Sequence, residues 1–169
     1  LDEVRVPEAN LLGAPGRGVR NFLTILDDGR IAISALALGC ARACLETALE
    51  YAGERNAFGG PIGRFQGLAF QLSDLAVKVE NAHNLTYKAA WLKDRGRSIS
   101  QAAAMAKLYS TEAAVDATRL AAQVLGGAGF IEETPVARFY RDAKILEIGE
   151  GTSEIQRLVI ARNLGLPLA

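Results

Sequence analysis

The sequence has few of the residues that build common catalytic and metal centres. Of its 169 residues, two are cysteine, one is histidine, one is methionine and one is tryptophan. The single histidine, His83, has no acidic or cysteine cluster near it in the sequence, so the chain lacks the parts for metal-dependent or Ser-His catalysis. We therefore expect no metal site, and we interpret His83 as a plain helix residue.

The two cysteines lie four residues apart, at Cys40 and Cys44, in a stretch whose pattern is helical. This placement is poor for a disulfide between them and is typical of small buried side chains. The cysteine usage therefore indicates a reduced, intracellular protein, which we expect in the cytoplasm, or in the mitochondrial matrix if the source is eukaryotic.

The sequence also lacks an excess of charge of either sign and a long hydrophobic run. Its 19 basic and 19 acidic side chains cancel, so no long-range field favours nucleic acid or an anionic membrane surface. We find no apolar run of about 18 residues, the length that spans a membrane, and no signal peptide at the start. These absences favour work on a small molecule, with neither nucleic acid nor a membrane as partner.

Helical periodicity dominates what the sequence does contain. Apolar residues recur three and four apart over residues 18–55, 65–94, 100–125, 135–147 and 152–164. Segments rich in glycine or proline separate several of these helices, at residues 56–63, 126–129 and 149–151. The pattern predicts an all-α protein: an antiparallel up-and-down four-helix bundle with a short N-terminal extended segment and an extra C-terminal helix.

Two details of the helices are also predicted. The third helix is expected to be capped by Ser98 or Ser100, and its many alanines are expected to let a neighbouring helix approach closely. The apolar stripe of the first helix is expected to consist of Phe22, Leu26, Ile33, Leu36, Ala37, Cys40 and Cys44.

A single carboxylate, Glu150, stands between Gly149 and Gly151 just before the last predicted helix. One interpretation is structural: a turn between two helices, in which Thr152 or Ser153 caps the second. The other is chemical, because a carboxylate on open backbone can act as a general base while adjacent amides polarise a carbonyl oxygen. Proton abstraction beside a thioester is chemistry of this kind, and a redox version of it needs a cofactor as hydride acceptor.

Several motifs in a fixed order make the chain resemble the acyl-CoA dehydrogenase family over its whole length. These are Val6 to Gly13, Leu26-Asp27-Asp28-Gly29-Arg30, Glu54 to Gly59, Phe65-Gln66, Gln123 to Phe130 and Arg141 to Ser153. The resemblance implies that residues 1–17 are the end of a preceding β-domain with its linker. It also implies that residues 18–169 are the C-terminal helical-bundle domain.

In that family the cofactor is FAD. The resemblance implies removal of the α proton of an acyl-CoA thioester while the flavin accepts the β hydride, which yields the trans-2-enoyl-CoA. Glu150 matches the catalytic base of the family. Some members instead carry the base at the position of Gly29 and have no carboxylate at the position of Glu150, so this sequence fits the first group. The isolated domain is expected to be inactive.

The resemblance also implies a set of binding residues. The substrate-binding positions are Asp27, Arg30 and Gly151. Of the cofactor-binding residues given next, those numbered 55 to 127 would touch the flavin of a neighbouring subunit. Those numbered 152 to 154 would touch the flavin beside Glu150. The cofactor-binding positions are Arg55, Phe58, Gln66, Gln123, Val124, Leu125, Gly126, Gly127, Thr152, Ser153 and Glu154.

Some of these assignments have a purely structural alternative. Arg55 also fits a solvated charge at the end of a helix, and Gln123 fits a helix-terminal side chain that satisfies free carbonyl groups. Asp27 and Arg30 also fit an ordinary i,i+3 ion pair on a helix.

The expected partners are an acyl-CoA, an electron-transfer flavoprotein and further copies of the chain, as a dimer or a homotetramer in fatty acid metabolism. Two alternatives stay open. One is an acyl-CoA oxidase of the same superfold, in which oxygen re-oxidises the flavin. The other is a non-catalytic assembly or binding module.

Overall fold

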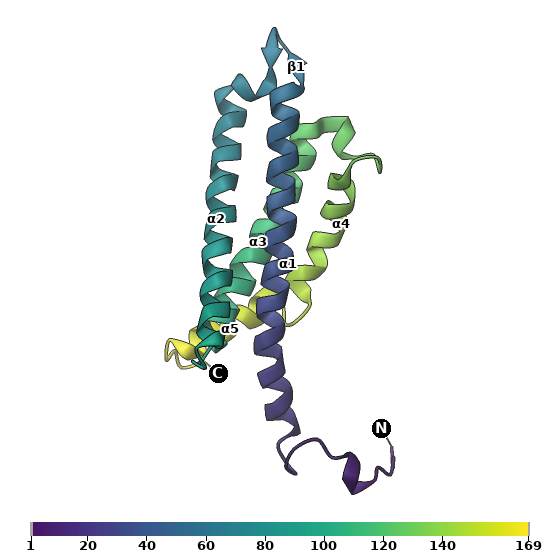
Figure 1. Cartoon of the computed structure of the whole chain (residues 1–169), viewed down its shortest axis with the longest axis vertical. Coiled ribbons are helices and arrows are strands. Elements are labelled where there is room, and N and C mark those ends of the chain that lie inside the picture. Colours follow the sequence, from purple (N-terminus) through teal and green to yellow (C-terminus); the bar gives the residue numbers. More distant parts are fainter. Residues whose placement is uncertain (1, 169) are drawn as a thin grey trace.

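The computed structural model describes residues 2–168, and five α-helices dominate this part of the chain (Figure 1). α3 is the central helix, since it packs against each of the other four. α1 to α4 form the predicted up-and-down bundle and α5 is the extra helix, so the expected fold class is confirmed. The helices are α1 (Gly18–Glu54), α2 (Gln66–Asp94), α3 (Ser100–Leu125), α4 (Pro135–Ile148) and α5 (Ser153–Asn163).

Local signals explain most helix ends. Thr152 is the N-cap of α5, where its hydroxyl accepts a hydrogen bond from the amide of Ile155 at 3.4 Å. Gly126 follows α3 with a φ of 59°, a conformation that favours glycine. The predicted cap of α3 by Ser98 or Ser100 is wrong, because Ser100 is already the first helical residue and no side chain of the described residues caps this end.

The predicted loop between α1 and α2 contains a small antiparallel hairpin. Its strands are β1 (Asn56–Ala57) and β2 (Gly60–Pro61), joined by Phe58 and Gly59. Both joining residues have positive φ, 51° and 90°, as a type I′ turn requires. The Arg64 guanidinium donates hydrogen bonds to the carbonyl oxygens of Phe58 and Gly59 at 2.6 and 3.0 Å. The hairpin therefore forms a defined end of the bundle (Figure 1).

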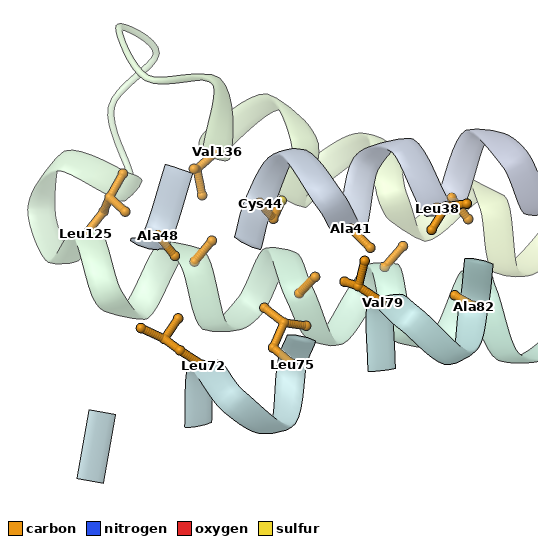
Figure 2. Packing of buried hydrophobic residues seen from close by; sticks show 14 of the residues in the cluster. Leu38, Ala41, Cys44, Ala48, Leu72, Leu75, Val79, Ala82, Leu125 and Val136 are labelled. Atoms are coloured by element: carbon orange, nitrogen blue, oxygen red, sulfur yellow. The ribbon is translucent and has the colours of Figure 1, made fainter. Parts of the chain in front are cut away.

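The helices meet through small side chains. The buried positions of α1 step mostly three and four apart and are Arg30, Ser34, Ala37, Leu38, Ala41, Cys44, Ala48 and Ala52. The buried alanines of α3 are Ala103, Ala104, Ala106, Ala113, Ala114, Ala117 and Ala121. Because alanine side chains are small, they allow the backbones of α1 and α3 to approach closely, and these two helices share the largest helix contact. Leu72, Leu75 and Val79 of α2 complete the core (Figure 2).

Two large residues assigned to the apolar stripe of α1 lie on the surface. Phe22 and Leu36 are each 61% exposed, whereas Ala37 and Cys44 of the same predicted stripe are buried. The prediction was wrong for the two large residues because helical spacing alone does not distinguish a large side chain from a small one. The face of α1 that packs on α3 is occupied mainly by small side chains.

α1 also meets a length and composition criterion for a membrane span. Contrary to the expectation from the sequence, it contains an 18-residue window with a mean hydropathy of 1.5. About a third of that window, 33%, is buried inside the bundle. A helix of a protein core meets the same criterion, so this finding is weak evidence for a membrane.

Residues 2–17 precede the bundle as an exposed segment with one short 3-10 helix, Glu8–Asn10. α1 then begins at Gly18, where the first helix was expected. The assignment of residues 1–17 to the end of a β-domain and of 18–169 to the bundle domain stays a prediction. The two end residues of these segments, Leu1 and Ala169, lie outside the described residues.

The close contact between α1 and α3 yields a prediction on stability. Ala114→Leu, at a fully buried position of α3, is expected to lower the free energy of unfolding by about 1–3 kcal/mol, since the extra carbon atoms find no space. The matched control, Ala76→Leu on the exposed side of α2, is expected to change it by less than about 0.5 kcal/mol. Urea unfolding measures both, and equal effects would contradict the packing.

Candidate functional site

Glu150 lies on a tight turn between α4 and α5. Its φ is 56°, in the left-handed region that residues other than glycine rarely adopt, and the next residue, Gly151, has a φ of 93°. A Cβ at Gly151 would lie 2.9 Å from Nε2 of Gln156, so a larger residue does not fit there. Strained backbone of this kind often occurs at functional sites, which favours the chemical interpretation of Glu150.

Two buried side chains hold this turn. Lys107 of α3 donates hydrogen bonds from Nζ to the backbone oxygens of Glu147, at 3.0 Å, and Gly151, at 2.8 Å. Gln156 of α5 donates from Nε2 to the backbone oxygens of Glu150, at 3.2 Å, and Gly151, at 2.8 Å. Both side chains are completely buried. The backbone conformation of Glu150 is therefore set by α3 and α5 as well as by the turn itself.

The carboxyl group of Glu150 lies against Gly29 of α1. A Cβ at position 29 would lie 2.8 Å from Cδ of Glu150 and closer still to Oε2. Glu150 is half-buried, and the hydrogen bonds and ion pairs of residues 2–168 leave its carboxylate without a partner. The same residues provide no acceptor for its backbone amide. A free carboxylate and a free amide are thus available to a bound molecule.

Asp27 and Arg30 flank this contact on α1. Nη1 of Arg30 donates a hydrogen bond to Oδ1 of Asp27 at 2.5 Å, and Arg30 is only 5% exposed. This is the i,i+3 ion pair that the sequence offered as the alternative to substrate binding, and the binding role stays a prediction. Burial raises the pKa of Asp27, and the charge of Arg30 opposes that change. Nε of Arg30 has no hydrogen-bond partner among residues 2–168.

Lys107 is the residue of this site that the sequence did not single out. A lysine within a helix is usually exposed, and nothing in its neighbourhood marked it as different. The structure buries it completely, and burial lowers the pKa of its ammonium group from 10.5 to about 8, while the Glu147 carboxylate opposes this change. The available signal was its spacing, since Lys107 lies one helical turn after the buried Ala103 and one turn before the buried Thr111.

The first turn of α5 carries the residues assigned to the flavin beside Glu150. Thr152 caps the helix, and Ser153 is buried with a hydroxyl that has no hydrogen-bond partner among the described residues. Hydrogen bonds from its own backbone amide and from the Thr152 hydroxyl lower the pKa of the exposed Glu154 carboxyl. The N-terminus of a helix suits electronegative atoms of a bound ligand, because its first amides lack helical partners and carry the positive end of the dipole.

The other residues assigned to the cofactor lie at the hairpin end of the bundle. Arg55, at the end of α1, lines a shallow cavity of about 400 Å³ together with residues 124–128. Apart from its chain neighbours, no described residue comes within 4 Å of a Cβ built at Gly126 or Gly127, so the backbone there is open to a ligand. Leu125 is different, because its side chain is buried in the core and only its backbone can face the cavity.

Three further predicted residues are exposed near this end. Phe58 is 91% exposed in the hairpin turn, and Gln66 is the exposed first residue of α2. Gln123 lines a separate cavity of about 1010 Å³, beside Phe130. The predicted cofactor residues therefore form two groups at different levels of the bundle, one at the hairpin and one at the turn between α4 and α5 (Figure 1).

The histidine and the two cysteines, for which the sequence predicted no catalytic role, lie on the helices of the bundle. His83 lies half-buried in α2 with its ring 4.3 Å from that of Tyr87. Cys40 and Cys44 are both free thiols. Residues 2–168 contain no group of three or more His, Cys, Asp or Glu side chains that could hold a metal ion.

The fold and the turn define an all-α helical-bundle domain with a carboxylate site at the junction of its last two helices. The family model described as acyl-CoA dehydrogenase, C-terminal domain, matches residues 16–165. The chain belongs to the acyl-CoA dehydrogenase family, as a C-terminal domain.

Individual relatives agree with this assignment. The chain is 54% identical to a probable acyl-CoA dehydrogenase of Bacillus subtilis, YngJ, over 97% of this chain and 43% of the relative. It is similar to the solved structure of butyryl-CoA dehydrogenase from Megasphaera elsdenii, with a TM-score of 0.92 and 45% identity over 94% of this chain and 42% of that one. A structure of PigA with FAD and proline gives a TM-score of 0.94 at 33% identity, over 98% and 43%. The chain thus spans about two fifths of the length of these relatives.

The burial of Lys107 yields a prediction on stability and pH. Between pH 8 and 10.5 the folded chain binds fewer protons at this lysine than the unfolded chain, so folding becomes more favourable as the pH rises through this window. The wild type is therefore expected to gain stability relative to Lys107→Met over that range. Urea unfolding at several pH values measures the gain.

The control for this prediction is Lys93→Met, which removes an exposed lysine paired with Asp28 at 2.8 Å. The wild type is expected to show no such gain relative to this variant. A constant stability difference between the wild type and Lys107→Met across the range would contradict the burial of a charged lysine.

Proposed function

We propose that the protein to which this domain belongs is an FAD-dependent enzyme that converts an acyl-CoA thioester to the trans-2-enoyl-CoA. The observation that carries the proposal is the Glu150 carboxylate, which has no partner among residues 2–168 and lies against Gly29 on a turn held by Lys107 and Gln156. Membership of the acyl-CoA dehydrogenase family supports it.

Glu150 is the general base in this proposal. Its carboxylate accepts the α proton of the thioester, for which it is free because no residue of the described chain occupies it. The free amide of Glu150 polarises the thioester carbonyl, which acidifies the α carbon and stabilises the negative charge that develops on oxygen. FAD, when bound, supplies the acceptor for the β hydrogen as hydride.

The residues of both groups fit FAD. Thr152, Ser153 and Glu154 form the N-terminus of α5 beside the base, where the positive end of the helix dipole favours electronegative atoms of a ligand. At the hairpin end, the Arg55 guanidinium suits a pyrophosphate, and the open backbone at residues 126–127 suits an adenosine. Because the two groups lie at different levels of the bundle, we assign them to flavins of two subunits, so the active form is a homo-oligomer.

The relatives suggest further properties of the whole protein. Similarity to butyryl-CoA dehydrogenase favours a short acyl chain. An electron-transfer flavoprotein would take the electrons that FAD, when bound, has accepted. From the cysteine usage we further propose that the protein acts in the cytoplasm, or in the mitochondrial matrix of a eukaryote. Each copy of the domain carries both groups, but they face different flavins, so a single isolated copy completes neither flavin site and is inactive alone.

Glu150→Gln tests the proposed base. In the full-length, FAD-loaded enzyme this change removes the basic oxygen while it preserves size, so flavin binding is expected to persist and the rate of flavin reduction to fall by at least about 100-fold. Anaerobic mixing with butyryl-CoA, followed by the loss of flavin absorbance, measures the rate. Near-normal reduction by the variant would refute the role of Glu150.

The same assay separates the oxidase alternative. After reduction, the wild type is expected to reduce an electron-transfer flavoprotein, and release of hydrogen peroxide in air at the full turnover rate would identify an oxidase instead.

Gly29→Ala tests the contact between α1 and the base. The new Cβ would lie 2.8 Å from Cδ of Glu150, so the carboxyl group is expected to move and kcat to fall by about 10- to 100-fold. The fold is expected to persist, because the displaced group is the flexible end of a side chain. The matched control is Gly39→Ala in the same helix, where, apart from the nearby backbone of the helix itself, no described residue comes within 4 Å of the new Cβ. It is expected to keep kcat and to add about 0.5–1 kcal/mol of stability, and equal kcat values in the two variants would contradict the placement of Glu150.

A further inference from the structure

A charged group supports the turn at a place where an uncharged donor already acts. Gln156 donates hydrogen bonds to the backbone oxygens of Glu150 and Gly151. Lys107 adds a second donor to Gly151 and also reaches Glu147, in the last turn of α4. Desolvation of a completely buried ammonium group costs far more free energy than desolvation of an amide. An uncharged side chain would fill the same space at lower cost, so packing alone does not explain a lysine at this position.

We propose that Lys107 is a positioning residue for the base, which fixes the direction of the Glu150 side chain by joining the backbone on both sides of it. This inference rests on the proposed role of Glu150 as the base. One bond of Nζ ends before the turn, at Glu147, and the other ends after it, at Gly151. The left-handed backbone of Glu150 therefore cannot rotate unless one of these bonds breaks.

The same contact stabilises the end of α4. The carbonyl groups in the last turn of a helix lack helical partners and carry the negative end of its dipole, which a cation stabilises. The last turn of α4, residues 145–148, contains no basic residue. Lys107 supplies the cation from α3, so loss of its charge loosens the end of α4 and the base together.

Charged groups of four helices determine when Lys107 is protonated. Burial lowers its pKa most, and Arg30 of α1 lowers it further. Glu147 of α4, Glu154 of α5 and Glu112 of α3 raise it, with a net value of about 8. As the pH rises above this value, the ammonium group becomes a neutral amine, which has fewer N–H donors and forms weaker hydrogen bonds.

The test uses the full-length, FAD-loaded enzyme and the variant Lys107→Met. We expect kcat to fall by about 10- to 100-fold, since small misplacement of a catalytic group has effects of this size. KM is expected to change little, because Lys107 is buried and its hydrogen bonds within residues 2–168 go to backbone oxygens. With α-deuterated butyryl-CoA the kinetic isotope effect is expected to rise, because proton abstraction becomes slower relative to the other steps.

A second measurement needs no variant. In the wild type, kcat is expected to fall and the isotope effect to rise as the pH passes about 8, while the free energy of unfolding gains the contribution of Lys107. If Lys107 had only a structural role, kcat would not fall while the free energy of unfolding rises. In Lys107→Met the changes of kcat and isotope effect above pH 8 are expected to vanish. Lys107→Arg keeps a cation at all these pH values, so it is expected to recover part of kcat and to show no alkaline change.

The matched control is Lys93→Met, which is expected to keep the kcat and the isotope effect of the wild type. A normal kcat and isotope effect in FAD-loaded Lys107→Met would overturn the inference, and so would a wild-type isotope effect that stays constant through pH 8. If Lys107→Met does not fold, the wild-type pH series decides alone. Activity of Glu150→Gln would refute the proposed function, whereas an inactive Glu150→Gln with a normal Lys107→Met would refute this inference only.

Discussion

The close approach of α1 and α3 is the constraint on which the candidate site depends. Buried alanines on α3 face small residues on α1, so the two backbones pack closely along the bundle. This approach brings Gly29 of α1 toward the Glu150 carboxyl group, while the packing of α4 and α5 on α3 puts Lys107 within hydrogen-bonding distance of the turn. Larger side chains between the helices would separate these groups. The geometry of the site therefore depends on the packing of the helices around α3.

The turn between α4 and α5 combines strained backbone with buried charge. Glu150 keeps a left-handed conformation because Lys107 and Gln156 hold the neighbouring carbonyl groups from two different helices. The desolvation of Lys107 is offset by two backbone oxygens and by the nearby carboxylate of Glu147. Stable packing alone does not require such an arrangement, and its cost is consistent with a role in orienting a reactive group.

Sequence patterns predicted the helices and their order, and they marked Glu150 as unusual. Local features sufficed for this, because helical spacing and flanking glycines are read within a few residues. The exposure of Phe22 and Leu36 was missed, because the pattern does not say which face meets the central helix or how much room that face has. Lys107 was missed for a related reason: its partners, Glu147 and Gly151, lie far along the chain.

The sequence by itself determined the all-α class, the places where the helices end, and the presence of one carboxylate on a glycine-flanked turn. Only the tertiary structure decided that this carboxylate lies against Gly29 and that a buried lysine holds the turn. The reason is the range of the interactions. Helix formation depends on neighbours in the chain, whereas the direction of Glu150 depends on α1, α3 and α5, which meet the turn only after the bundle has packed.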